Sequence, residues 1–315
     1  MRTHQLPAEQ STAVQVLSRD TSPVLRVEPG DRVVVESLDA WGHLERQVAP
    51  GEPGSYRFPD RIGHALTGPI EVAGAEPGDT LAVHFESLEP YEWGWTVANR
   101  QDDAFLRGLG LDGAEPAWLL WDLDRRMGSG TNQFGHSVLL SPFLGVVGLP
   151  PAEPGEHSTT PPRTAGGGNI DCRELTAGST LFLPVTVPGA LLHLGDGHAA
   201  QGDGEVGGTA IECGMTTTFT VDLVQDAPLE VIHALTPTAR ITFGFDADLN
   251  RATSEALGAM LTWLQQLYGL ERNTALALAS SVVDLRITQI ANRTWGVHAV
   301  LGLDAVLESG AINAG

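Results

Sequence analysis

Residues 217–224 read TTFTVDLV, a short stretch in which β-branched and apolar residues predominate. Such residues suit the pleated, half-buried surface of a β-strand. Four more stretches have this composition and are bounded by Gly, Pro and Asp residues that favour turns: 32–38, 80–85, 179–187 and 239–245. The sequence therefore predicts a mainly β fold with β-sandwich or barrel-like layers.

The spacing of apolar residues changes after Asn250. A helical period is kept by Leu257, Met260, Leu261, Leu264 and Leu267. Gly269 is placed to end this helix, and Asn273 can cap a second helix that continues over 275–283. Residues 285–290 then favour a strand, so we expect a smaller α+β part at the C-terminal end.

The length and these patterns are consistent with a single domain over residues 1–315. Within it we expect a β-rich portion, 1–245, and a helix-helix-strand portion, 246–315. Residues 150–163 are dense in Pro, Glu, Ser and Thr, which predicts a loop between strands.

The charge composition excludes several classes of function. The chain has a formal net charge of -21, and all 18 of its basic residues are arginine. Nucleic acids and anionic membranes are poor partners for such a chain, because phosphate neutralisation needs clustered basic residues. The absence of lysine removes Schiff-base chemistry, the P-loop, and the lysine-dependent amidase and nitrilase sites.

Cysteine usage favours a reducing compartment. The two cysteines, Cys172 and Cys213, form no Cys-x-x-Cys pair, and we interpret each as a small core residue. The N-terminal residues do not resemble a secretory signal, and no run of about 18 apolar residues could span a bilayer. We therefore expect a cytoplasmic protein without a membrane partner.

Residues 194–205, LGDGHAAQGDGE, place four groups able to bind a divalent ion in one glycine-rich stretch: Asp196, His198, Asp203 and Glu205. Asp196 and His198 are two positions apart, as are Asp203 and Glu205, so in extended backbone the two side chains of each pair point to one side. Carboxylates this close raise each other's pKa unless a cation or hydrogen bonds hold them ionised. A metal site and an acidic turn between strands are both compatible with this stretch.

Two distant stretches offer further groups. Residues 166–171, GGGNID, put Asn169 and Asp171 after a glycine run that lets the backbone approach a ligand closely. Residues 36–40, ESLDA, place Asp39 at the end of an apolar strand, where loops often carry functional side chains. Asp171 is the best remote partner for the 194–205 stretch.

Several blocks in the same order along nearly the whole chain resemble the acetamidase/formamidase family. They are 36–40 (ESLDA), 66–77 (LTGPIEVAGAEP), 142–148 (PFLGVVG), 167–171 (GGNID), 175–183 (LTAGSTLFL), 187–205, 279–290 (ASSVVDLRITQI) and 296–298 (GVH). The resemblance implies a β-rich homodimer or higher homo-oligomer that hydrolyses small linear amides such as formamide or acetamide and releases ammonia. It also implies a divalent metal, zinc or calcium or both, which agrees with the acidic and histidine residues above.

On this basis we expect a metal-activated water to attack the amide carbonyl. The expected metal ligands are Asp171, Asp196, His198 and Asp203, and the expected catalytic proton carriers are Glu205 and Asp39. Asn169, Gly167 and Gly168 are the expected substrate-binding residues. His64 and His136 are possible surrounding groups, and the metal site lies within the β-rich portion.

The chain departs from the family pattern at two places. It has Trp41-Gly42-His43 after the Leu-Asp-Ala segment, where many relatives carry a smaller or Gln-type residue, and Ala165-Gly166 where relatives have a His. An altered pocket leaves a cyclic amide, either a lactam or an imide, as an alternative substrate. A non-catalytic protein with structural metal ions is the other alternative.

Overall fold

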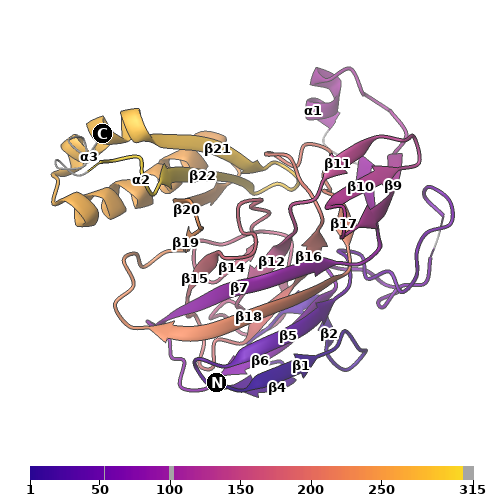
Figure 1. Ribbon diagram of the computed structural model, residues 1–315, viewed down its shortest axis with the longest axis horizontal. Helices are drawn as coiled ribbons and strands as arrows, with labels where there is room; N and C mark the ends of the chain where they lie inside the picture. Colours follow the sequence, from indigo (N-terminus) through magenta and orange to yellow (C-terminus); the bar gives the residue numbers. More distant parts are fainter. Residues whose placement is uncertain (53, 99–102, 308–315) are drawn as a thin grey trace.

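The computed structural model describes residues 1–52, 54–98 and 103–307, and it consists mainly of strands in two large sheets (Figure 1). Among these residues, nine strands form the first sheet. In spatial order they are β1 (Thr3–Leu6), β5 (Arg32–Ser37), β18 (Met215–Val224), β7 (Thr80–Pro90), β15 (Thr180–Pro184), β19 (His233–Leu235), β20 (Ala239–Asp246), β22 (Trp295–Gly302) and β21 (Val283–Gln289).

The second sheet contains eleven of the described strands. Its main path is β11 (Ser137–Leu139), β10 (Ser129–Asn132), β9 (Ala117–Asp124), β8 (Trp93–Ala98), β17 (Glu212–Cys213), β16 (Leu192–His198), β12 (Phe143–Gly148) and β14 (Gly167–Asn169). β6 (Leu66–Val72) pairs with β16 and with the short strands β2 (Ala13–Val14) and β4 (Leu25–Val27). A separate small sheet joins β3 (Val16–Leu17) to β13 (His157–Ser158).

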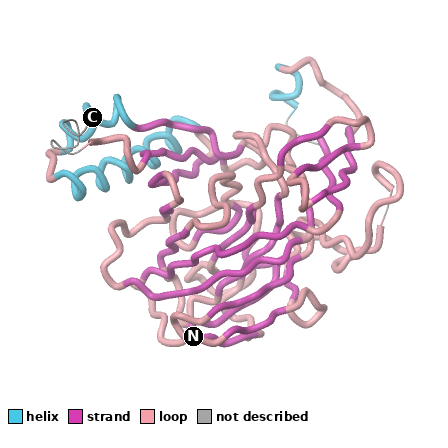
Figure 2. The backbone as a smooth tube through the Cα atoms, in the orientation of Figure 1, coloured by secondary structure: helices cyan, strands magenta, loops and turns pink. Residues whose placement is uncertain are grey.

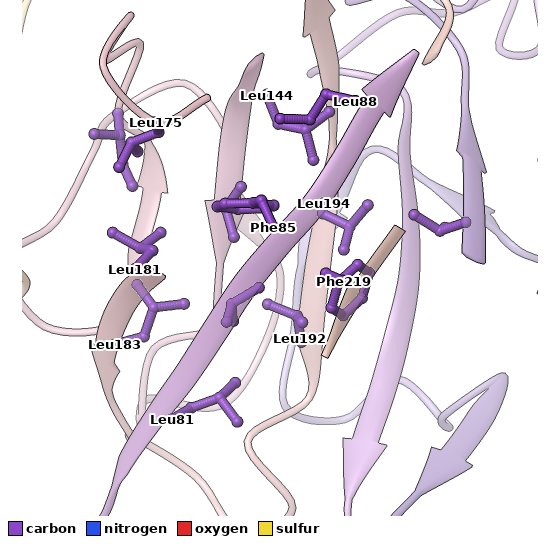
Figure 3. Packing of buried hydrophobic residues seen from close by; sticks show 14 of the residues in the cluster. Leu81, Phe85, Leu88, Leu144, Leu175, Leu181, Leu183, Leu192, Leu194 and Phe219 are labelled. Carbon is purple, nitrogen blue, oxygen red and sulfur yellow. The ribbon is translucent and has the colours of Figure 1, made fainter. Parts of the chain in front are cut away.

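The main core lies between the two sheets. β18 buries Phe219 and Val221 on one face, together with Thr217, while its other threonines remain half-buried on the opposite face, the alternation that the period of a strand requires. Figure 3 shows Phe85 of β7 and Phe219 beside Leu192 and Leu194 of β16. Burying each such side chain contributes about 1.5–3 kcal/mol, so this shared cluster holds the second sheet against the first.

The prediction of a mainly β chain with helices toward the C-terminal end is confirmed (Figure 2). Each of the five stretches predicted as strands contains one: β5, β7, β15, β18 and β20. β7 continues to Pro90, beyond the predicted end at residue 85, because its pairing with β18 runs on to the partners Pro90 and Met215. The predicted 150–163 loop holds only the two-residue strand β13.

The C-terminal helices follow the predicted spacing except at one end. α2 (Leu249–Tyr268) ends at Gly269, whose φ of 64° is left-handed as predicted. The prediction that Asn273 caps the next helix is wrong: α3 (Arg272–Val282) has Glu271 at its N-cap, without a side-chain capping bond. Arg272 instead ties the helix start to α2 by donating to the Gly258 carbonyl at 3.2 Å. Tertiary contact thus sets this boundary.

α2 packs across β20 and β22, which extend the first sheet. Gly244 of β20 permits the close approach, because a Cβ there would collide with the Ala252 carbonyl of α2 and lie 2.7 Å from the Ala256 nitrogen. Thr242 also donates to the Ala256 carbonyl at 2.7 Å. The remaining helix, α1 (Asp103–Gly108), is short, and no described helix is long and apolar enough to cross a membrane.

Candidate metal centre

β16 carries the two side chains at the heart of the site. Asp196 and His198 are two residues apart and fully buried, and Asp196 Oδ1 lies 3.6 Å from His198 Nε2. The glycines between and beside them serve the packing: a Cβ on Gly197 would lie 2.6 Å from the Cys213 carbonyl of β17. The GDGH pattern therefore lets β16 lie close to its neighbours while its polar side chains converge, as its two-residue spacing predicts.

Asp171 joins this pair across β12. The Gly145 carbonyl of β12 accepts from the backbone N–H of Asp171 at 3.2 Å, which brings the start of the 171–175 turn over the strand. A Cβ on Gly145 would lie 2.5 Å from Asp196 Oδ2, 2.7 Å from Asp171 Oδ1 and 2.8 Å from His198 Cε1. The three side chains thus meet over a position that only glycine can occupy.

Glu205 and Glu212 complete the cluster. In β17, Glu212 is the direct partner of His198, and its Oε1 lies 3.4 Å from His198 Nε2. Ligand atoms of Asp171, Asp196 and His198 lie within 4.8 Å of one another, as do those of His198, Glu205 and Glu212. His198 belongs to both groups and is the centre of the site.

Gln201 fixes the orientation of His198. Its amide nitrogen donates to the Asp171 carbonyl at 2.7 Å, so its oxygen faces His198 Nδ1 at 2.9 Å. Because an amide oxygen can only accept, Nδ1 must carry the hydrogen and Nε2 faces the carboxylates. Outer partners of this kind orient the imidazoles that bind metals.

The electrostatics of the cluster call for positive charge. Burial raises the pKa of Asp171 and Glu205 well above the usual range and that of Glu212 to about 7. Burial also opposes ionisation of Asp196, but the nearby His198 and His64 imidazoles outweigh it and lower its pKa. For His198, burial disfavours the charged ring, yet Glu212 and Asp196 raise its pKa well above normal. Without another cation, His198 supplies the balancing charge.

The buried polar atoms fit a divalent cation. Four of them make no hydrogen bond: Asp171 Oδ2, Asp196 Oδ1, His198 Nε2 and Glu212 Oε2. Unpaired buried polar atoms are costly, and these four belong to His198 and to carboxylates grouped with it. Oxygen donors with one imidazole are compatible with zinc and with calcium.

A groove of about 540 Å³ leads from the surface to this cluster. Its lining includes the buried Gln201 and Glu205, and Leu119, Trp121 and Ile211 contribute apolar walls. Glu205 therefore belongs both to the buried cluster and to the lining of the groove. A small molecule in the groove could reach the polar centre at that side chain.

Asp203 and Asp39 lie outside both groups of potential ligands. Asp203 is exposed and lines the outer part of the groove. Asp39 is buried, and its Oδ1 accepts from the backbone N–H groups of Trp41 and His43. His43 Nδ1 lies 3.1 Å from both Asp39 oxygens, so the Asp39 carboxylate binds and orients His43.

The glycine run around Asn169 is structural in part. Asn169 is buried and donates to the Thr160 carbonyl at 3.1 Å, while its Oδ1 makes no hydrogen bond. A Cβ on Gly167 would lie 2.6 Å from Leu183, so this glycine permits close packing of β14. Gly168 has a φ of 120°, and a Cβ added there would make only ordinary van der Waals contacts.

Glu212 is the site residue that the sequence analysis missed. A signal for it exists, because Glu212 is an acidic residue inside the otherwise apolar run 210–215, AIECGM. A charged residue in such a run is rarely buried without a partner.

The sequence analysis also named His64 and His136 as possible groups around the site. His64 Nε2 lies 3.9 Å from Asp196 Oδ2, whereas His136 is exposed and its backbone N–H donates to Asn132 Oδ1.

Comparison with known proteins shows the family of the chain. The model of the acetamidase/formamidase family matches residues 3–156 and 152–303. A formamidase of Methylophilus methylotrophus is 28% identical over 282 residues, covering 70% of this chain and 68% of the relative. The crystal structure of an acetamidase from Bacillus halodurans matches with a TM-score of 0.83 at 26% identity, covering 96% of this chain and 97% of that protein. The crystal structure of an acetamidase from Yersinia enterocolitica matches with a TM-score of 0.84 at 27% identity, covering 97% of this chain and 93% of that protein. The chain therefore belongs to the acetamidase/formamidase family of amidohydrolases, which act on carbon–nitrogen bonds other than peptide bonds.

Proposed function

We propose that this amidohydrolase cleaves the carbon–nitrogen bond of a small linear amide with the help of a divalent metal ion, releasing ammonia and a carboxylate. The observation that carries the proposal is the convergence of Asp171, Asp196 and His198 over Gly145, with buried ligand atoms that lack hydrogen bonds. The names of the acetamidase and formamidase relatives support the choice of substrate.

Asp171, Asp196 and His198 would hold the ion, and Glu212, whose Oε1 lies 3.4 Å from the same His198 nitrogen, would be a further ligand. Zinc or calcium, or both, suit this set of donors. When bound, such an ion lowers the pKa of a coordinated water and polarises an amide carbonyl. Asp203 is not included in this ligand set, because it is exposed.

Glu205 is the proposed proton carrier. It lies where the groove meets the cluster, so it can approach both the attacking water and the nitrogen that leaves. Burial, followed by the neighbouring Asp171 carboxyl, raises its pKa and favours the protonated form. The attacking water would lose its first proton to solvent, and protonated Glu205 can then donate a proton to the leaving nitrogen as the carbon–nitrogen bond breaks. The Glu205 carboxylate takes up the remaining proton of the new carboxylic acid, so the products are ammonia and a carboxylate.

Gln201 and Asp39 have supporting roles in this proposal. Gln201 keeps His198 Nε2 directed at the ion by accepting from Nδ1. Asp39 holds the loop that carries Trp41 and His43, two of the residues in which the chain departs from the family pattern. We assign Asn169 to substrate contact because its buried Oδ1 is free to accept from an amide N–H.

The test is ammonia release from formamide, acetamide, and a set of lactams and imides, with the protein as purified, chelated, and restored with zinc or calcium. The matched variants are Asp196→Asn, in the buried cluster, and Asp203→Asn, in the exposed part of the same stretch. We expect restorable turnover on linear amides, a loss of about 100-fold or more in D196N, and little change in D203N.

The other outcomes are equally informative. Turnover on lactams or imides alone would replace the linear substrate with a cyclic one. Absence of ammonia from every compound, in folded protein with bound metal, would overturn the catalytic proposal. If chelation unfolds the chain, the ion is structural, since metal binding then supplies folding energy.

A further inference from the structure

A second group of potential ligands lies beside the first, in the turn that follows Asp171. Ligand atoms of Cys172, Glu174 and His298 lie within 4.8 Å of one another. Cys172 and His298 are fully buried, and Glu174 is partly buried. The amidase proposal uses none of these three residues.

We propose that Cys172, Glu174 and His298 bind a second metal ion, zinc, which is structural. In a tetrahedral site with zinc bonds of about 2.0–2.3 Å, neighbouring ligand atoms lie roughly 3.3–3.6 Å apart. Cys172 Sγ lies 3.2 Å from Glu174 Oε2, and His298 Nε2 lies 3.4 Å from the same oxygen. Two of the three separations thus already match neighbouring ligand atoms of such a site, and the third, between Cys172 Sγ and His298 Nε2, is within 4.8 Å.

Outside the group, the partners of Glu174 and His298 bind atoms other than Oε2 and Nε2. Thr288 Oγ1 lies 2.8 Å from His298 Nδ1, and the buried Nε2 makes no hydrogen bond. Arg286 binds Glu174 through Oε1 at 2.8 Å, which leaves Oε2 directed at Cys172 and His298. Arg286 and His298 are direct partners in the β21–β22 register, so the sheet itself brings them to Glu174.

The chemistry of the donors favours zinc over calcium here. A thiolate and an imidazole are ligands that zinc prefers, whereas calcium takes oxygen donors. Binding would release the thiol proton of Cys172 to solvent, since the thiolate is the ligand. The ion would join the 171–175 turn to β22, and so hold the turn that carries Asp171 against the C-terminal part of the first sheet.

Cobalt substitution tests this site without any assay of turnover. A thiolate bound to Co²⁺ gives a near-ultraviolet charge-transfer band, and the amidase centre offers only oxygen and nitrogen donors. We expect the band in cobalt-loaded protein, its loss in Cys172→Ser, and its retention in Cys213→Ser, which changes the other buried cysteine. Zinc content should fall by one equivalent per chain in C172S but not in C213S, and His298→Gln should weaken or remove the band.

The band should also persist in Asp196→Asn, which separates this inference from the proposed amidase centre. Absence of the band in folded, cobalt-loaded wild-type protein would overturn the inference, and so would a band that survives C172S or disappears in C213S. In that case Glu174 only accepts hydrogen bonds from Cys172 and His298. Circular dichroism on each variant shows whether the fold is retained, and the wild-type band decides the matter if C172S does not fold.

Discussion

Replacing Gly145 with alanine is the sharpest perturbation of the amidase centre. The added methyl carbon would lie 2.5 Å from Asp196 Oδ2, whereas ordinary contacts of a Cβ begin at 3.4 Å. Relief of this overlap therefore requires a displacement of about 0.9 Å, and Asp171 and His198 are crowded at the same time. All three proposed ligands must move.

A displacement of about 1 Å in a catalytic group can cost about 100-fold in rate, which corresponds to roughly 2.7 kcal/mol of transition-state stabilisation. We expect G145A to lower kcat/KM for the best amide by at least that factor and to weaken metal binding. Overpacking should also reduce the free energy of unfolding by about 1–3 kcal/mol.

The assay compares ammonia release, metal content and urea unfolding of G145A with those of Gly202→Ala. Gly202 lies in the same region, and a Cβ there would meet no atom within 4 Å. G202A should behave like the wild-type protein in all three measurements. A folded G145A with wild-type metal content and turnover would refute the convergence of ligands over Gly145.

Three further predictions follow from particular contacts. Gln201→Leu should lower metal affinity about 10–100-fold, because His198 loses the acceptor that orients it; isothermal titration of the chelated protein measures this, and unchanged affinity would contradict the role of Gln201. In chelated protein, thermal stability should fall as pH rises from about 4.5 toward 7. Burial raises the pKa of Glu212 to about 7, so in this range folded Glu212 keeps a proton that the unfolded chain has lost. Glu212→Gln should flatten this part of the stability profile, and an unchanged slope in the variant would contradict the role of Glu212. Gly244→Ala should destabilise the contact of α2 with β20 by about 1–3 kcal/mol in urea unfolding, and a stability equal to wild type would show that the helix can shift freely.

Local composition was enough to predict five of the strands, β5, β7, β15, β18 and β20, and one helix end. β18 and α2 lie where the residue types and apolar spacing indicate, because period and propensity act over a few neighbouring residues. The start of α3 was not predictable in this way. Its position depends on Arg272 bridging to α2, a contact between residues that no local pattern relates.

The candidate site shows the same division. Asp196, His198 and Asp171, which the structure brings together, could be proposed from the sequence because glycine-spaced polar residues stand out in an apolar context. Glu212 reaches the cluster only through the pairing of β17 with β16. Asp203 resembles its neighbours in sequence but is turned to solvent at a bend of the loop, and spacing alone cannot distinguish it from Glu205.

Cys172 illustrates a further limit of the sequence. Its burial agrees with the interpretation as a core residue. Its proximity to His298, however, arises from the packing of a turn near residue 172 against a strand more than a hundred residues later. A contact between residues so far apart in the sequence leaves no local pattern, so the group of Cys172, Glu174 and His298 could not be predicted from the sequence.

The proposed metal-dependent hydrolysis is tested most directly by the rate of ammonia release as metal is returned stepwise to the chelated, folded protein. We predict that the rate rises in proportion to occupancy of the centre formed by Asp171, Asp196 and His198, and that D196N never recovers. Full turnover in metal-free protein, or equal recovery in D196N, would contradict it.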